Sequence, residues 1–250
     1  MGTTCSLFAI DADLVEGERW VRRMAARLTR FSADSEVSRL NDHTGEWRNV
    51  SADLSAVLQA ALDAYAMSAG MVNAAVLPSM VAAGYTRPLI EGPTVATLDR
   101  ASPLPPLPDV LELRDGMARV ARGAGIDLGG IAKGWIADRL VEILGPSSLV
   151  NLGGDLMARG EWPVGVGGTT LMLRDQGAAT SSVRRRRWGD VHHLIDPRTG
   201  LPAQSGLSEV SVVAASGFEA EVIAKTALLL GPSLGPAYCA TSALAWWLDQ

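Results

Sequence analysis

Two residues, Lys133 and Lys225, are the only lysines among the 250 residues, and each stands in a segment whose pattern suits phosphate binding. Lys133 belongs to "GIDLGGIAKG", residues 125–134, where a double glycine separates it from Asp127. Glycines let a backbone approach a ligand closely, and the N–H groups at a helix start attract phosphate. The pattern is neither the nucleotide P-loop nor Gly-x-Gly-x-x-Gly, so an ordinary strand-to-helix turn with a solvated lysine is the alternative. We expect both lysines to face one phosphate-bearing ligand.

The second lysine lies in "FEAEVIAKTALLLG", residues 218–231, which is largely apolar and predicts a helix. Glu221 and Lys225 are four residues apart, so they share one face of that helix and can pair. Such a pair contributes only a few tenths of a kcal/mol on an exposed surface. The apolar neighbours predict that this pair is partly buried instead.

Two of the three histidines are adjacent in "VHHLIDPRTGLPA", residues 191–203. Adjacent residues of a strand point to opposite faces, so only one of His192 and His193 can face a site. The same geometry makes the two a poor metal chelate. A histidine titrates near neutral pH and can accept a proton during catalysis. The alternative is a plain β-turn at "DPRTG" with two structural histidines.

The segment "AATSSVRRRRW", residues 178–188, places small hydroxyl residues before four arginines. A charge run of this kind usually marks a solvated loop. The functional alternative is a turn that contacts a ligand, followed by arginines that bind acidic groups.

The elements that must position these residues alternate between helices and strands without a regular βαβ repeat. Helices are predicted at residues 16–30, 51–70 with Ser51 as N-cap, 132–145 and 218–231. Strands are predicted at residues 3–10, 147–156, 208–216 and 242–250, with a hairpin over 110–121 that turns at Asp-Gly. A proline-rich connector covers residues 86–108. We therefore predict an α+β fold with a mixed or antiparallel sheet, forming one domain over residues 1–250.

The composition is that of a soluble globular protein, with 48% hydrophobic and 20% charged residues. A formal net charge of −5 argues against nucleic acid or an anionic membrane as the main partner. The two cysteines, Cys5 and Cys239, form no metal cluster, and buried thiols are favoured over a disulfide. The start "MGTTCSLFAIDAD" lacks a basic region and a long apolar run, which predicts a cytoplasmic protein without a signal peptide.

Seven short segments, taken together and in order, resemble the ApbE-type FAD:protein FMN transferases. They are "FSADSEVSRLN", "GMVNAAVLPSM", "GIDLGGIAKGW", "VNLGGDL", "GAATSS", "HHLIDPRTGLPA" and "AEVIAKTALLLG". The resemblance implies a T-shaped α+β fold that holds FAD in a cleft. It also implies transfer of the FMN half of FAD to a Thr or Ser hydroxyl of an acceptor flavoprotein that carries a flavinylation motif, with release of AMP. An FAD carrier or sensor, and an FAD pyrophosphatase that yields FMN and AMP, are the alternatives.

The resemblance also implies roles for single residues. Asp127 matches a flavin-contacting aspartate, and Lys133 matches a residue at the FAD phosphates or the adenosine side. The other positions that match FAD contacts are Met71, Val72, Asn73, Thr180, Ser181, His193 and Ile195. Thr180 and Ser181 correspond to a turn beside the ligand.

Magnesium is implied as well, and here the sequence departs from the family pattern. Gly130 matches a position whose carbonyl is a metal ligand, Glu221 stands where Asp is usual, and Lys225 stands where a metal-binding Thr is expected. An ammonium group and a divalent cation repel each other by several kcal/mol at ~4 Å and an effective dielectric of ~20. We therefore hypothesise that Lys225, paired with Glu221, replaces part of the magnesium charge. Two further departures are Asn73 for Asp and Ala33 for a ring-stacking Tyr.

The reaction that this resemblance implies is an in-line displacement at phosphorus, which depends on positioning and charge stabilisation. Lys133, Lys225 and the N–H groups around Gly129 and Gly130 are expected to spread the developing charge. His193, or failing that His192, is expected to accept the hydroxyl proton.

Overall fold

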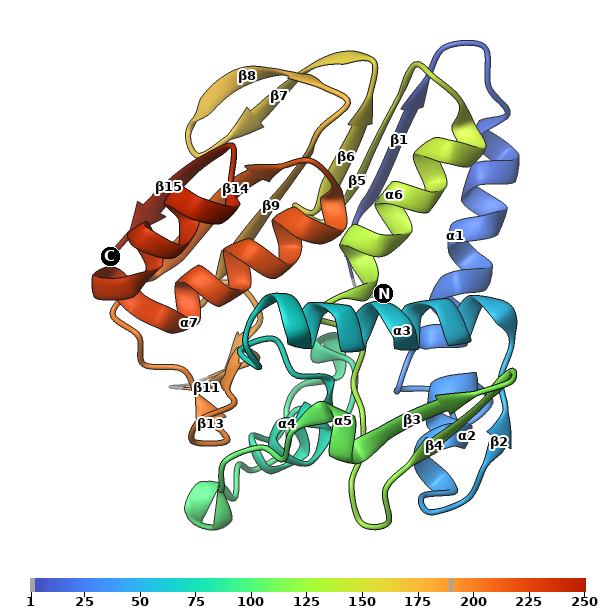
Figure 1. Ribbon diagram of the computed structural model, residues 1–250, viewed down its shortest axis with the longest axis vertical. Coiled ribbons are helices and arrows are strands. Elements are labelled where there is room, and N and C mark those ends of the chain that lie inside the picture. The colour runs from blue at the N-terminus through green and yellow to red at the C-terminus, as the bar shows by residue number, and fades with distance from the viewer. Residues whose placement is uncertain (1–2, 189–190) are drawn as a thin grey trace. The chain divides into compact units, whose positions relative to one another are not determined.

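The computed structural model describes residues 3–188 and 191–250, and Figure 1 shows their helices and strands. Contacts divide these residues into two compact units. Unit 1 is drawn from residues 25–130 and 183–203, and unit 2 from residues 3–24, 131–182 and 204–250. Each unit is thus assembled from distant stretches of chain, and the proline-rich connector is not a boundary between them. The single domain over residues 1–250 stays a prediction.

Unit 2 is built on a six-stranded sheet in the order β1-β5-β6-β9-β14-β15. Its strands are β1 (Cys5–Ala9), β5 (Ser148–Leu152), β6 (Leu156–Arg159), β9 (Gly177–Ser182), β14 (Glu209–Ala214) and β15 (Ala245–Asp249). All these neighbours pair antiparallel, so the sheet is antiparallel and not mixed. The strand predicted at the carboxyl end, β15, lies at one edge of this sheet, and β1 lies at the other.

Two layers cover the faces of this sheet. Helices α6 (Ala132–Leu144) and α7 (Gly217–Ser242) pack on each other and on one face, as Figure 1 shows. A hairpin of β7 (Glu161–Val166) and β8 (Thr169–Arg174) packs on the other face. Apolar side chains therefore point both ways along β14, where Val212 faces the helices and Val213 faces the hairpin. Helix α1 (Leu14–Leu28) begins in unit 2.

Three glycines allow α6, α7 and β9 to approach one another closely. A Cβ atom on Gly134 of α6 would lie 2.4 Å from the carbonyl oxygen of Gly217, at the start of α7. A Cβ atom on Gly177 of β9 would lie 2.2 Å from the Gly217 nitrogen. Asp138 of α6 accepts hydrogen bonds from the N–H groups of Gly217 at 2.7 Å and of Phe218 at 3.0 Å. The last glycine of "GIDLGGIAKG" thus serves helix packing, and it fixes the start of α7 against α6.

Helix α7 extends beyond its predicted end. Gly231 breaks the helical backbone with φ 78° and ψ −176°, and the helix resumes after this kink and continues to Ser242. Gly231 followed by Pro232 is a local stop pattern, so the sequence predicted an end there.

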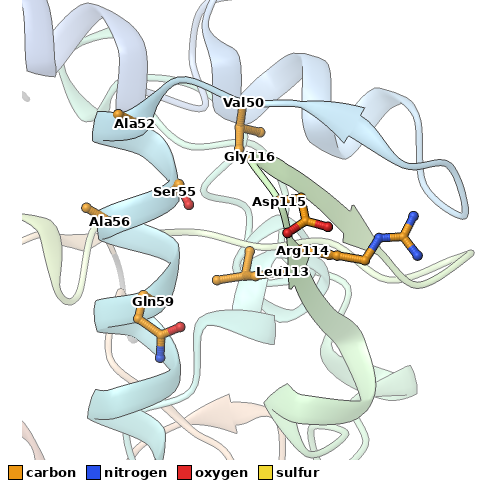
Figure 2. A pocket seen from close by; sticks show the side chains of 9 residues that line it. All are labelled: Val50, Ala52, Ser55, Ala56, Gln59, Leu113, Arg114, Asp115 and Gly116. Carbon is orange, nitrogen blue, oxygen red and sulfur yellow. The ribbon is translucent and has the colours of Figure 1, made fainter.

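Unit 1 contains α3 (Ala52–Met67), α2 (Glu36–Asp42) and a three-stranded sheet in the order β2-β4-β3. The strands are β2 (Arg48–Asn49), β3 (Leu111–Arg114) and β4 (Met117–Val120). Both local predictions are confirmed: Ser51 caps α3 by accepting a hydrogen bond from the Leu54 N–H, and Asp115 and Gly116 form the hairpin turn with φ 49° and 74°. An open groove of about 610 Å³ lies between α3 and this turn (Figure 2), and it includes none of the predicted site residues.

Short elements make up the rest of unit 1. They are η1 (Ala74–Val76), α4 (Leu77–Ala82), η2 (Leu89–Glu91), η3 (Leu98–Arg100), α5 (Leu107–Val110), β10 (Arg187–Trp188), β11 (Val191–His192), β12 (Ile195–Asp196) and β13 (Leu201–Pro202). The connector is largely irregular, as its prolines predict.

Neither Cys5 nor Cys239 forms a disulfide. Cys239 is buried as predicted, whereas Cys5 is exposed, because β1 is an edge strand. Across residues 3–188 and 191–250, no helix has the length and apolar character needed to cross a membrane. The cytoplasmic location stays a prediction.

Candidate functional site

A buried cluster of charges in unit 2 contains both lysines. Glu221, on the first turns of α7, has a side chain that is only 3% exposed. Its Oε1 lies 3.2 Å from Nζ of Lys133 and 3.6 Å from Nζ of Lys225. Its Oε2 accepts a hydrogen bond of 2.8 Å from the N–H of Gly134. The predicted Glu221–Lys225 pair and its burial are confirmed, and the two ammonium groups share one carboxylate oxygen.

Asp155 completes this cluster. It follows β5 in "NLGGDL", its side chain is 3% exposed, and its carboxylate contacts the Lys133 ammonium group. The charge cluster, defined as Lys133, Asp155, Glu221 and Lys225, therefore carries two positive and two negative charges. The sequence prediction missed Asp155, although it lies in one of the segments that carry the family resemblance.

Ionisation of Glu221 depends on its neighbours. Burial acts to raise its pKa, but the ammonium groups of Lys133 and Lys225 and the N–H of Gly134 outweigh burial and hold the pKa below its ordinary value. Glu221 is thus an anion at neutral pH. It holds both lysine side chains near the starts of α6 and α7.

The residues present do not fit a magnesium ion. Mg²⁺ prefers octahedral coordination by oxygen atoms at about 2.1 Å. Both Glu221 oxygens already have N–H or ammonium partners, and Asp155 is paired with Lys133. Within the described part of the chain, no three His, Cys, Asp or Glu side chains gather as a metal site would need.

A second group of polar residues surrounds Asp127 in unit 1. Oδ2 of Asp127 lies 2.5 Å from Nε of Arg30, and Oδ1 accepts a hydrogen bond of 2.7 Å from the N–H of Gly129. The Asn41 amide exchanges two hydrogen bonds of 2.9 Å with the backbone of Ile126. This network fixes the orientation of Asp127. It also engages the Gly129 N–H inside the loop, so the expectation that this N–H faces a phosphate is wrong for this structure.

Aromatic rings hold the Arg30 side chain in place. Its guanidinium lies 4.2 Å from the ring centroid of Phe31 and 4.7 Å from that of Tyr85, and it donates a hydrogen bond of 2.6 Å to the Tyr85 carbonyl. A hollow of about 350 Å³ opens beside it. Its lining residues are Arg30, Phe31, Ala33, Ser38, Asp42, Thr86, Arg87, Pro88 and Glu91. Sequence analysis missed Arg30, which stands one residue ahead of a family-like segment.

Asn73 has a structural role in unit 1. Its Oδ1 caps η1 by accepting a hydrogen bond from the Ala75 N–H, and its Nδ2 donates to the Pro105 carbonyl, each at 2.9 Å. A carboxylate cannot donate the second of these bonds, which accounts for Asn at this position. The neighbouring Met71 and Val72 have buried side chains.

The structure separates the roles of the two histidines. Nδ1 of the buried His192 accepts a hydrogen bond of 3.2 Å from the Leu194 N–H, so its Nε2 carries the proton donated to the Ala203 carbonyl at 2.9 Å. Burial lowers the pKa of His192. His192 is therefore structural, and the half-buried His193 is the better candidate for proton transfer. The Ile195 side chain is buried in a cluster with Met80 and Ala83.

Thr180 and Ser181 lie on strand β9, so the prediction of a turn is wrong. The Thr180 hydroxyl is 2.8 Å from the Ser211 hydroxyl, on the sheet face that packs against the β7–β8 hairpin. Ser181 points to the opposite face, toward the layer of α6 and α7. Of the two, only Ser181 shares a face with the helices that carry the charge cluster.

The family follows from comparison with known proteins. The profile described as the ApbE family matches residues 1–247. This chain belongs to the ApbE family. The predicted resemblance, which rested on seven short segments, is confirmed.

Individual relatives agree with the ApbE assignment. A FAD:protein FMN transferase of Klebsiella pneumoniae is 33% identical over 129 residues, covering 44% of this chain and 39% of that protein. One from Haemophilus influenzae is 24% identical over 253 residues, covering 86% of this chain and 72% of that protein. The crystal structure of the ApbE protein of Thermotoga maritima has a TM-score of 0.84 at 22% identity, covering 99% of this chain and 91% of that chain. This likeness confirms the α+β fold.

Proposed function

We propose that this ApbE family member transfers the FMN moiety of FAD to a Thr or Ser hydroxyl of an acceptor flavoprotein and releases AMP. The observation that carries the proposal is the charge cluster, where two ammonium groups meet at one buried carboxylate. In this cluster the lysines are the more exposed members, at 16% and 14%, while both acids are 3% exposed. An anion that arrives from solvent therefore meets ammonium groups first, as a pyrophosphate would require.

The chemistry is one displacement at phosphorus. The acceptor hydroxyl oxygen forms a bond to the FMN-side phosphorus, and the bond from that phosphorus to the AMP oxygen breaks. Lys133 and Lys225 stabilise the negative charge that develops on the phosphate oxygens and on departing AMP. We assign no step to magnesium, because the Glu221 carboxylate is already engaged.

The acceptor hydroxyl must lose a proton during this step. His193 takes that proton, because both ring nitrogens of His192 are engaged in structural hydrogen bonds. Asp127, held by Arg30 and by the Gly129 N–H, orients the flavin and does not attack it. Met71, Val72 and Ile195 have buried apolar side chains, and we assign them no side-chain chemistry.

Incubation of the purified protein with FAD and a candidate acceptor tests the proposal. Covalent FMN on the acceptor, detected by in-gel flavin fluorescence and intact mass, supports transfer. Free FMN and AMP without labelled acceptor indicate a pyrophosphatase, and intact bound FAD indicates a carrier. Either of these two results across several acceptors contradicts the transferase proposal. The matched variant Lys133→Met removes one ammonium group and should abolish labelling.

A further inference from the structure

We propose that Lys225 takes the place of a divalent cation, so that this protein binds the pyrophosphate of FAD without magnesium. The inference rests on the proposed function, because FAD is its assumed ligand. It concerns how the charge of that ligand is neutralised, which the family assignment leaves open.

Both carboxylate oxygens of Glu221 already have partners. A metal-binding carboxylate needs an oxygen lone pair that points at the ion. Here Oε2 accepts the Gly134 N–H, and Oε1 lies within 3.6 Å of both Lys133 and Lys225. A magnesium ion at Oε1 would have to displace an ammonium group or lie against it, and like charges repel.

The charges within the cluster are also balanced. The two ammonium groups supply two positive charges, the same as one Mg²⁺, and Glu221 and Asp155 supply two negative charges. The cluster is therefore neutral before a ligand arrives, and no residual charge attracts a cation. A buried pair of acids with fewer cations would carry a net negative charge, which is what a metal site requires.

Helix α7 holds Lys225 in a defined place beside Glu221. Glu221 and Lys225 are one turn apart on α7, and the Gly134–Gly217 approach fixes α7 against α6. Lys225 is thus held within reach of the carboxylate by helix geometry. Its ammonium group is a positive charge held beside Glu221, and its side chain is more exposed than that of the carboxylate, at 14% against 3%.

The experiment measures FAD binding, not turnover. Protein stripped of metal is titrated with FAD by flavin fluorescence, once in EDTA and once in excess MgCl₂. For the wild type we expect the two Kd values to agree within about twofold, and calorimetric titration with MgCl₂ alone to give no binding heat. For Lys225→Thr we expect FAD binding in EDTA to weaken by about tenfold or more, and Mg²⁺ to restore part of it. The threonine removes one of the two ammonium groups at Oε1 of Glu221, where Lys133 remains, and adds a hydroxyl oxygen as a ligand.

Arg139→Gln is the matched control. Arg139 lies on α6, where its exposed side chain pairs with Glu142 at 3.0 Å, so the variant removes one positive charge outside the cluster. Its Kd should match that of the wild type in both buffers. A similar loss in this variant would mean that net charge, not Lys225, determines FAD affinity, and it would overturn the inference.

The wild-type titrations decide the matter even if Lys225→Thr does not fold, which circular dichroism would reveal. Wild-type FAD binding that weakens tenfold in EDTA and returns with Mg²⁺ would overturn the inference while the proposed function stands. No FAD uptake in either buffer would contradict the proposed function itself, and this inference with it.

Discussion

The close approach of α6 and α7 gives the sharpest prediction, because replacing Gly134 by alanine places a methyl group against backbone. The new Cβ would lie 2.4 Å from the Gly217 oxygen, 2.7 Å from its carbonyl carbon and 2.8 Å from Cα of Phe218. None of these atoms can rotate away, since all belong to the backbone. The helices must separate, and overpacking of this kind costs about 3 kcal/mol, the upper end of the usual range.

A compensating gain reduces this cost. Alanine is favoured over glycine inside a helix by about 1 kcal/mol. The net loss in the free energy of unfolding for Gly134→Ala is therefore about 2 kcal/mol. For a chain of this size that loss lowers the melting temperature by about 4–8 °C. Because the Gly134 N–H holds Glu221, the variant should also weaken FAD binding.

Urea denaturation followed by circular dichroism measures the loss. The matched control is Gly165→Ala in strand β7, where a Cβ atom would meet nothing within 4 Å. That control should change the free energy of unfolding by less than about 0.5 kcal/mol. If Gly134→Ala proves as stable as the control, then α6 and α7 do not pack as closely as described, and the argument for a fixed Glu221 is refuted.

Three further predictions concern polar side chains of the two units. Glu221→Gln should lower the free energy of unfolding by about 3 kcal/mol at pH 7, because it removes the buried anion that Lys133 and Lys225 share, while Lys133 keeps its contact with Asp155. Since the pKa of Glu221 is held below its ordinary 4.5, its contribution is present above that pH and is lost as the pH falls through the folded-state pKa. The gap between wild type and this variant in urea denaturation should therefore narrow as the pH falls below 4.5 and close once the pH is below the folded-state pKa, and a gap that does not narrow would contradict ionic pairing. His192→Ala should lower the free energy of unfolding by about 1–3 kcal/mol, because it leaves the Ala203 carbonyl without its donor. His193→Ala should instead remove acceptor labelling and leave the melting temperature near that of the wild type. The reverse pattern would exchange the roles of the two histidines. Asn73→Asp should cost about 1 kcal/mol by removing the donor to Pro105, and unchanged thermal stability would show that this bond contributes nothing.

Local patterns in the sequence were enough to predict local structure. Ser51 as a helix N-cap and Asp115–Gly116 as a hairpin turn depend on backbone preferences within a few residues, and both are confirmed. The errors arose where neighbours in space override such preferences. The kink at Gly231 does not end α7, and the small hydroxyl residues Thr180, Ser181 and Ser182 lie on a strand inside the sheet and not in a loop.

Sequence alone determined the family and the pairing of Glu221 with Lys225, because residues four apart on a helix are neighbours whatever the rest of the chain does. Only the tertiary structure brought Lys133 and Asp155 to that pair and showed which histidine is structural. Glu221 accepts its hydrogen bond from a backbone N–H 87 positions away, and that distance in sequence is closed by glycines that let two helices touch. Contacts of this kind follow from packing, which no spacing along the chain encodes.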